Sequence, residues 1–231
     1  MCGKKDYDID KENFTENLIM ASLADLRKDY TLHGLLEHEV ASCPFDQFAK
    51  WFSDAVNAKV TEPNAMTLAT ATVHGAPSAR IVLLKSFDER GFTFFTSYEG
   101  RKAGELAENP RAALVFYWPD LERQIRIEGE VQKVSKLESE EYFLSRPLGS
   151  RIGAWASKQS SVMKGREELE ARWHEIEKRF AETIVPLPET WGGYRLWPNS
   201  MEFWQGRPSR MHDRILYERN GTFWGIKRLG P

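Results

Sequence analysis

The chain has 231 residues, of which 41% are hydrophobic and 29% charged, with 32 Lys and Arg against 34 Asp and Glu. This length suits one or two domains with a sizeable core, the composition excludes a largely disordered chain, and a net charge of −2 argues against nucleic-acid binding. The longest apolar run, residues 112–118, is far shorter than the roughly 20 residues that cross a bilayer. With no signal-peptide pattern and no disulfide framework, we expect a cytoplasmic protein that contacts no membrane.

The N-terminal part predicts a tail followed by two helices. Residues 1–17 are polar and aperiodic, which predicts a flexible tail, and residues 18–231 are expected to form a single domain. Apolar residues recur at helical spacing over residues 18–30. Pro44 then opens a stronger helix, whose predicted apolar face carries Phe45, Phe48, Trp51, Phe52, Ala55 and Val56.

The middle of the chain changes to strand patterns. Besides a short helix over residues 102–108, we predict strands over residues 65–73, 78–87, 92–97, 111–118 and 124–134. The connections between consecutive strands are short, which implies antiparallel pairing, because a parallel crossover needs a dozen or more residues. This region therefore predicts an antiparallel meander that can close into a barrel.

The C-terminal part mixes helices and strands. Ser135 and Glu138 form a capping-box pattern at the start of a helix through residue 144, and a charged helix is predicted over residues 164–181. Strand patterns return over residues 194–197, 201–204, 214–218 and 222–227, with Asn220-Gly221 as a hairpin turn. The predicted architecture is one α+β domain, a split antiparallel β-barrel with peripheral helices.

Several common site motifs are absent from the sequence. Neither the dinucleotide-binding glycine pattern, nor the P-loop, nor the Gly-x-Ser-x-Gly nucleophile motif occurs. The five His show no metal-ligand spacing, so no metal site is predicted.

Three short cationic motifs at predicted turns and strand ends point to anion binding instead. Arg101-Lys102 lies where a turn enters a helix, so two cations accompany free backbone N–H groups, which suits a phosphate. Tyr142, Arg146 and Ser150 offer donors to a second phosphate. The third motif, WQGRPSRMHDR over residues 204–214, combines three Arg, one His and an aromatic side chain. A solvated surface or a packed core explains each motif alone, but together they suggest two phosphates with an aromatic ring system between them.

Six stretches closely resemble the pyridoxamine 5′-phosphate oxidase family, and they occur in the family's order. They are RIVLLK (80–85), GRKAGELAENPRAAL (100–114), LERQIRIEGEVQKV (121–134), YFLSRPLGSRIGAWASKQS (142–160), VPLPETWGGYRLWP (185–198) and MEFWQGRPSRMHDRILY (201–217). The similarity extends from about residue 26 to the last residue. It implies a homodimeric split β-barrel that binds FMN at the subunit interface.

The resemblance also implies an activity and a set of site residues. The activity is the oxidation of pyridoxamine 5′-phosphate and pyridoxine 5′-phosphate to pyridoxal 5′-phosphate in vitamin B6 metabolism, with O₂ as acceptor, H₂O₂ as product and ammonia released from the amine. The FMN contacts implied by motif position are Arg80, Ile81, Val82, Leu83, Leu84, Lys85, Phe95, Thr96, Arg101, Lys102, Gln124, Gln159, Ser160, Trp204 and Arg214. The implied substrate contacts are Lys85, Tyr142, Arg146, Ser150, Arg210 and His212, with Arg27 to Tyr30 as a segment that can cover the site.

The chemistry of these side chains is consistent with that assignment. FMN performs the redox step, so the protein contributes orientation and electrostatics. Arg210 and His212 are the predicted catalytic residues at the reacting end of the pyridine ring. Arg210 acts there as a positioning group, because guanidinium does not deprotonate in proteins. His212 can exchange a proton near neutral pH or act only as a hydrogen-bonding group.

Two alternatives remain open from the sequence. One is a flavin reductase on the same barrel, which would use a nicotinamide donor. The other is a non-catalytic binder of FMN or pyridoxal phosphate, against which the presence of both Arg210 and His212 argues. Among the eight Trp, most are expected in the core or an interface, and Trp204 is predicted to neighbour the flavin.

Overall fold

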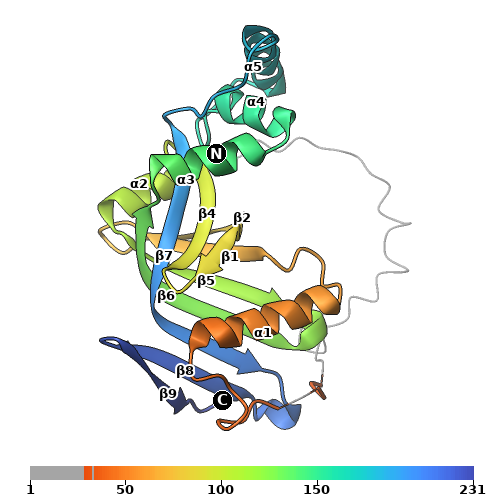
Figure 1. Cartoon of the computed structure of the whole chain (residues 1–231), viewed down its shortest axis with the longest axis vertical. Coiled ribbons are helices and arrows are strands. Elements are labelled where there is room, and N and C mark those ends of the chain that lie inside the picture. Colours follow the sequence, from red (N-terminus) through yellow and green to blue (C-terminus); the bar gives the residue numbers. More distant parts are fainter. Residues whose placement is uncertain (1–28, 33) are drawn as a thin grey trace, which may run out of the picture.

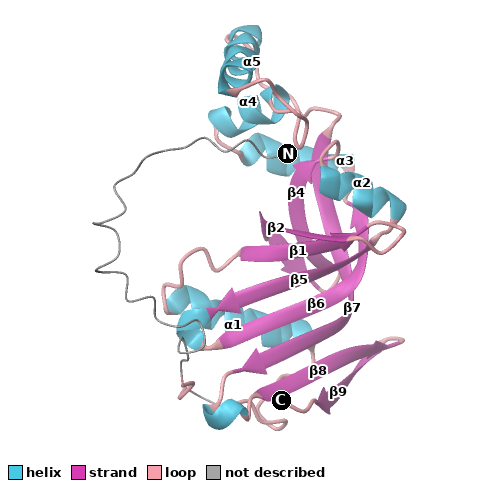
Figure 2. Ribbon diagram, turned by 180° about the vertical axis from the view of Figure 1, so that it is seen from behind, coloured by secondary structure: helices cyan, strands magenta, loops and turns pink. Residues whose placement is uncertain are grey.

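The computed structural model describes residues 29–32 and 34–231. It consists of one curled nine-stranded sheet, a helix across one face of that sheet, and four helices gathered at one end (Figures 1 and 2). The helices are α1 (Pro44–Asn57), α2 (Arg101–Glu108), α3 (Lys136–Ser145), α4 (Leu148–Ala156) and α5 (Arg166–Arg179). The predicted tail and the helix predicted over residues 18–30 lie wholly or mostly outside the described residues.

The strands pair in antiparallel fashion, as the short connections predict. Their order in the sheet is β2-β1-β5-β6-β7-β4-β3, and β8 and β9 continue the sheet from β7. The strands are β1 (Ala65–Ala71), β2 (Pro77–Leu83), β3 (Ser86–Asp88), β4 (Gly91–Ser97), β5 (Arg111–Trp118), β6 (Arg123–Lys133), β7 (Trp191–Gln205), β8 (Asp213–Asn220) and β9 (Phe223–Arg228). The fold thus confirms the α+β class and the curled antiparallel sheet.

The main core lies between α1 and the inner face of the sheet. Pro44 starts the helix at its first turn, and Phe48 is fully buried among the rings of Phe87, Phe92 and Phe116. The predicted face of α1 is correct except at Val56, which is 51% exposed. A second cluster joins α3, α4 and α5 to the end of the sheet around Phe143, Ile152, Val185 and Trp191.

Three predicted strands differ from the structure, and one helix was not predicted. The strand predicted over residues 78–87 is two strands, because the Leu84 N–H bonds the carbonyl of Asn64 whereas the Lys85 N–H bonds the carbonyl of Thr93 (2.8 and 2.9 Å). The chain thus changes partner strand between these two residues.

The strands predicted over residues 194–197 and 201–204 form one strand, β7, in which Pro198 lies at a β-bulge opposite Gly129. A bulge tolerates proline, which has no N–H to donate. The helix α4 was not predicted, because its two glycines break the apolar pattern. A Cβ added at Gly149 or Gly153 would lie 3.5 or 3.3 Å from the Trp173 ring of α5, so small residues fit this helix contact.

None of the helices that the structure describes combines the length and the apolar character that a membrane span requires. In the same part of the chain, no group of three or more His, Cys, Asp or Glu side chains is arranged to hold a metal ion.

Candidate functional site

A cavity of about 510 Å³ opens between β2, β4 and the helices α2 to α4. Twelve of the residues predicted from the sequence line it, and two others, Pro147 and Trp191, were not predicted. The twelve are Arg80, Ile81, Val82, Leu83, Lys85, Phe95, Thr96, Lys102, Tyr142, Arg146, Ser150 and Gln159. Residues from the stretches 80–85, 100–114 and 142–160 therefore meet in one place.

Lys102 forms one corner of the cavity. Its side chain is buried in the first turn of α2, and its Nζ donates to Gln159 Oε1 (2.7 Å) and to Thr96 Oγ1 (3.1 Å). Burial lowers the pKa of Lys102, with nearby Arg80 acting in the same direction. Gly100 precedes the helix, and a Cβ there would lie 2.4 Å from Gln159 Oε1, so a larger residue would displace the Gln159 amide from its present position. A buried ammonium beside a helix N-terminus is suited to a phosphate.

Arg101 and Ser160 lie beside this corner rather than in the cavity lining. The Ser160 Oγ accepts a hydrogen bond from the Arg101 backbone N–H (3.3 Å), and the Arg101 side chain is 65% exposed. Leu84, also predicted as a contact, has its side chain in the main core at 5% exposure.

Glu105, a residue that the sequence analysis did not select, organises the two arginines of this region. Its buried carboxylate accepts hydrogen bonds from Arg80 Nη2 (3.1 Å), Arg101 Nε (2.8 Å), Thr70 (2.5 Å) and Ser78 (2.6 Å). Burial alone would raise the pKa of Glu105, but these hydrogen bonds outweigh it and lower the pKa to about 2. In the sequence, the signal for this role is the four-residue spacing between Arg101 and Glu105, which lets the two side chains pair on one face of a helix.

Arg146 forms the second corner. Its guanidinium carbon lies 4.6 Å from the Trp191 ring centroid, its Nη1 is buried without a hydrogen-bond partner, and burial lowers the pKa of the group. Tyr142 stacks on Phe95 at 4.0 Å between ring centroids, and Lys85 Nζ lies 6.0 Å from the Tyr142 ring. Because a buried charged donor without a partner is costly, this corner fits an anionic ligand.

The remaining predicted residues form a second group around the end of β7 and the start of β8. The Tyr30 ring contacts Trp204 and His212 edge-on, with centroids 5.6 and 5.7 Å apart. Gln124 pairs with Trp204 across β6 and β7, and Trp204 pairs with Arg214 across β7 and β8. The Arg214 Nε donates to Glu202 (2.8 Å), which raises the pKa of Arg214.

The loop before β8 has an unusual backbone. Ser209 and Arg210 have φ values of 56° and 62°, in the left-handed region that non-glycine residues rarely adopt. Such backbone conformations cluster at functional sites. The Arg207 N–H donates to His212 Nδ1 (3.1 Å), so the neutral imidazole carries its proton on Nε2. Arg210 is exposed, and Arg27 lies outside the described residues.

The two groups lie at opposite ends of the molecule. Trp191 of the cavity begins β7 and Trp204 of the second group lies at its other end, and a 15-residue strand spans roughly 45 Å at about 3.3 Å per residue. Figure 1 shows β7 running from the helices at the top to β8 and β9 at the bottom. A single chain therefore does not bring Arg210 and His212 to the cavity.

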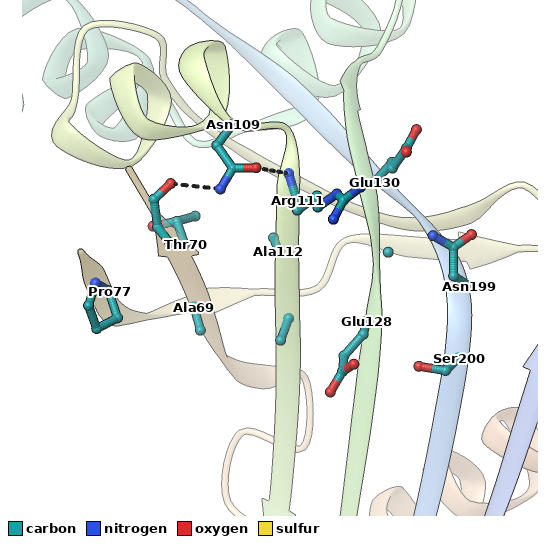
Figure 3. A pocket seen from close by; sticks show the side chains of 13 residues that line it. Ala69, Thr70, Pro77, Asn109, Arg111, Ala112, Glu128, Glu130, Asn199 and Ser200 are labelled. Carbon is teal, nitrogen blue, oxygen red and sulfur yellow. Dashed lines mark hydrogen bonds between the residues drawn. The ribbon is translucent and has the colours of Figure 1, made fainter. Parts of the chain in front are cut away.

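A further hollow of about 600 Å³ lies on the sheet face opposite α1 (Figure 3). Its lining combines small side chains such as Ala69 and Ala113 with the polar side chains of Asn109, Arg111 and Glu128. The Asn109 side chain bonds the Ala71 carbonyl (3.2 Å) and the Arg111 N–H (3.3 Å). None of the predicted site residues lines it.

The curled antiparallel sheet, with a cavity lined by two cationic corners and by stacked aromatic rings, defines a split-barrel protein whose cavity suits a planar, phosphorylated ligand. The family model described as pyridoxamine 5′-phosphate oxidase matches residues 52–180, and the model described as pyridoxine 5′-phosphate oxidase C-terminal dimerisation region matches residues 191–231. The chain belongs to the pyridoxamine 5′-phosphate oxidase family.

Similar proteins cover almost the whole chain. A pyridoxine/pyridoxamine 5′-phosphate oxidase of Cupriavidus taiwanensis is 60% identical over 92% of this chain and 100% of its own length. One from Trichormus variabilis is 57% identical over 91% and 99%. Among solved structures, PhzG from Burkholderia lata 383, in complex with tetrahydrophenazine-1-carboxylic acid, superposes with a TM-score of 0.83 at 33% identity, covering 88% of this chain and 100% of that one.

Proposed function

We propose that this chain is an FMN-dependent enzyme that oxidises pyridoxamine 5′-phosphate and pyridoxine 5′-phosphate to pyridoxal 5′-phosphate. One observation carries the proposal: a single cavity has two separate cationic corners, at Lys102 and at Arg146, each suited to a phosphate. The cofactor and the substrate each bring one phosphate. The relatives at 57–60% identity, named for this activity, support the same assignment.

The residues of the first corner fit FMN. Lys102, Arg101 and the N-terminus of α2 would hold its phosphate, with Ser160 and Gln159 as further polar partners. Residues 80–83, Lys85, Phe95 and Thr96, which line the cavity, would contact the rest of the cofactor. When bound, FMN supplies the two-electron chemistry by accepting a hydride from the substrate carbon.

The residues of the second corner would bind the substrate. Arg146 has an unpaired buried donor for the substrate phosphate, and Lys85, Tyr142 and Ser150 add a charge and two hydroxyl groups. These contacts would fix the position of the substrate ring and its reactive carbon.

Arg210 and His212 would complete the site from a second copy of the chain. A two-fold symmetric dimer makes the same contact twice, so it can place each protomer's cavity against the Trp204–His212 region of the other. The match of residues 191–231 to a dimerisation region supports this arrangement, with FMN at the interface. His212, with its proton on Nε2, would then donate a hydrogen bond to the substrate.

We further propose O₂ as the terminal acceptor. Two electrons from the substrate carbon and two protons convert O₂ to H₂O₂, and with the amine substrate water replaces the nitrogen, which leaves as ammonia.

Absorbance spectroscopy tests the function directly. The purified protein is expected to be yellow, to lose its flavin absorbance on anaerobic addition of pyridoxamine 5′-phosphate, and to regain it in air with release of H₂O₂. A flavin-loaded protein that turns over neither vitamer would refute the proposal. Rapid reduction by NADH without any vitamer would point to a flavin reductase instead.

A further inference from the structure

A cluster of charged side chains ties the segment that carries Tyr30 to the C-terminal hairpin. Arg228 on β9 donates to both carboxylate oxygens of Glu37, at 2.6 and 2.9 Å, and to Asp213 Oδ1 at 2.7 Å. The same guanidinium donates to the Leu35 carbonyl at 2.9 Å. One side chain near the end of the chain thus binds two residues of the N-terminal segment.

Asp213 lies at the centre of this cluster. Its side chain is only 15% exposed, and its Oδ2 accepts a hydrogen bond from the Leu35 N–H (3.0 Å) and lies 3.6 Å from Arg207 Nε. A single carboxylate therefore joins β9, the N-terminal segment and the loop that precedes β8. Hydrogen bonds to a charged group of this kind are stronger than neutral ones.

The segments that meet at Asp213 are the ones that bring Tyr30 and His212 together. The Arg207 backbone holds His212 through Nδ1, and the N-terminal segment presents Tyr30 to the same imidazole and to Trp204. The fit is close, because a Cβ at Gly206 would lie 2.6 Å from the Tyr30 ring. Asp213 thus accepts from the backbone of the segment that carries Tyr30 and lies beside the side chain of Arg207, whose backbone N–H holds His212.

We propose that Asp213, held by Arg228, is a positioning residue that keeps Tyr30 and His212 in one arrangement at the reacting end of the site. The inference rests on the proposed function for its effect on the reaction. Its structural part, the attachment of the N-terminal segment, is independent of what the enzyme oxidises. The Arg228–Glu37 ion pair alone is a weaker candidate for this positioning role, since Glu37 is 55% exposed and exposed ion pairs contribute little to stability.

Two measurements on the holoenzyme test this proposal with Asp213→Asn, which keeps the size of the side chain and removes its charge. The first is the rate at which chymotrypsin cleaves after Tyr30, followed by mass spectrometry. The second is the separation of kcat from KM for pyridoxamine 5′-phosphate. Because cleavage follows the population of the open segment, we expect it to become about tenfold faster, with kcat/KM lower by about the same factor.

The chain offers a matched control on the same hairpin. Glu218→Gln breaks the ion pair between Glu218 and Lys227, which joins β8 and β9 but contacts neither the N-terminal segment nor His212. This variant should show wild-type cleavage after Tyr30 and wild-type kinetics. FMN content and thermal midpoint of each variant show that the fold is retained.

The outcomes separate the two proposals. Faster cleavage and lower kcat/KM in Asp213→Asn, with FMN retained, support the positioning role, whereas a wild-type value of either overturns it. If Asp213→Asn does not fold, Glu37→Gln provides the test, because it weakens the bond between Arg228 and the segment that carries Tyr30 at an exposed side chain. The same cleavage and kinetic measurements then support or overturn the positioning role, with smaller expected changes. Failure of the wild-type enzyme to oxidise either vitamer refutes the proposed function while the cleavage comparison still reports on attachment.

Discussion

Arg146 lies against the rings of Trp191 and Phe143, and its Nη1 donor is buried without a partner. Leaving such a donor unpaired costs free energy, which a bound phosphate would recover. Burial lowers the pKa of Arg146, yet a guanidinium remains charged at any pH of interest. The residue is therefore a permanent cation with a buried donor that a bound anion would pair.

Replacing Arg146 by Ala should weaken substrate binding. We expect KM for pyridoxamine 5′-phosphate to rise about 10- to 100-fold, the effect of losing charged hydrogen bonds to a phosphate, with FMN content unchanged. Steady-state kinetics measure this, and Arg166→Ala, which breaks an exposed pair with Glu170 on α5, is the control. An unchanged KM would show that the substrate phosphate binds elsewhere.

Glu105 makes the stability of the protein depend on pH. The pKa of this carboxyl is lowered from 4.5 to about 2 in the folded state, so its ionised form stabilises the fold above about pH 4.5. That contribution is lost as the pH falls through about 2. Glu105→Gln should lower the free energy of unfolding at pH 7, and its difference from the wild type should shrink between pH 4.5 and 2. Urea unfolding at a series of pH values measures this difference; a constant difference down to pH 2 would contradict the assignment.

At the scale of elements, α1 shows how the apolar face of an amphipathic helix packs into the core. Its aromatic residues enter the curled sheet, and Phe48 contacts rings from β3, β4 and β5. The same pattern included Val56, which lies at the edge of the buried face. Ala55 in the same turn is fully buried, whereas Val56, one residue further and about 100° around the helix, is 51% exposed.

Two substitutions on α1 test this difference. Phe48→Ala should lower the free energy of unfolding by about 3–5 kcal/mol, the usual cost of removing a buried aromatic ring. Val56→Ala should change it by less than about 0.5 kcal/mol, because surface substitutions have small effects. Denaturant unfolding of both variants provides the comparison, and equal losses would mean that Val56 is covered in solution.

The elements predicted least well were those that depend on distant partners. The break between β2 and β3 follows from hydrogen bonds to Asn64 on one side and to Thr93 on the other. The helix α4 packs its two glycines against the Trp173 ring of α5. Neither partner lies within the local window that a sequence pattern describes.

For the whole molecule, the separation of the cavity from the Trp204–His212 group predicts that the active site is shared between two protomers. Arg146→Ala and His212→Ala homodimers should each have low kcat/KM. Heterodimers that contain one protomer of each variant have one intact composite site, so they should recover about half of the wild-type kcat/KM. Differently tagged chains, co-expressed and purified by both tags, allow this assay.

A second heterodimer controls for the subunit exchange itself. Here one protomer carries Lys102→Met and the other carries Arg146→Ala, so both substitutions lie in cavity residues. Each of the two cavities then contains one substitution, and activity should stay low. Recovery in this control, or its absence in the first heterodimer, would contradict a shared site.

The order of the six motifs determined the family, the class of fold and most of the cavity lining, because these depend on residue types and local spacing. Glu105 and Trp191 lie within these motifs but were not predicted as site residues, since their roles arise from contacts with residues distant along the chain. Only the tertiary structure decided that the predicted residues form two groups at opposite ends of β7. The physical reason is that an extended strand holds its two ends apart. The cavity residues and the Trp204–His212 group, although predicted as one site, can therefore meet only when a second copy of the chain supplies one of the two groups.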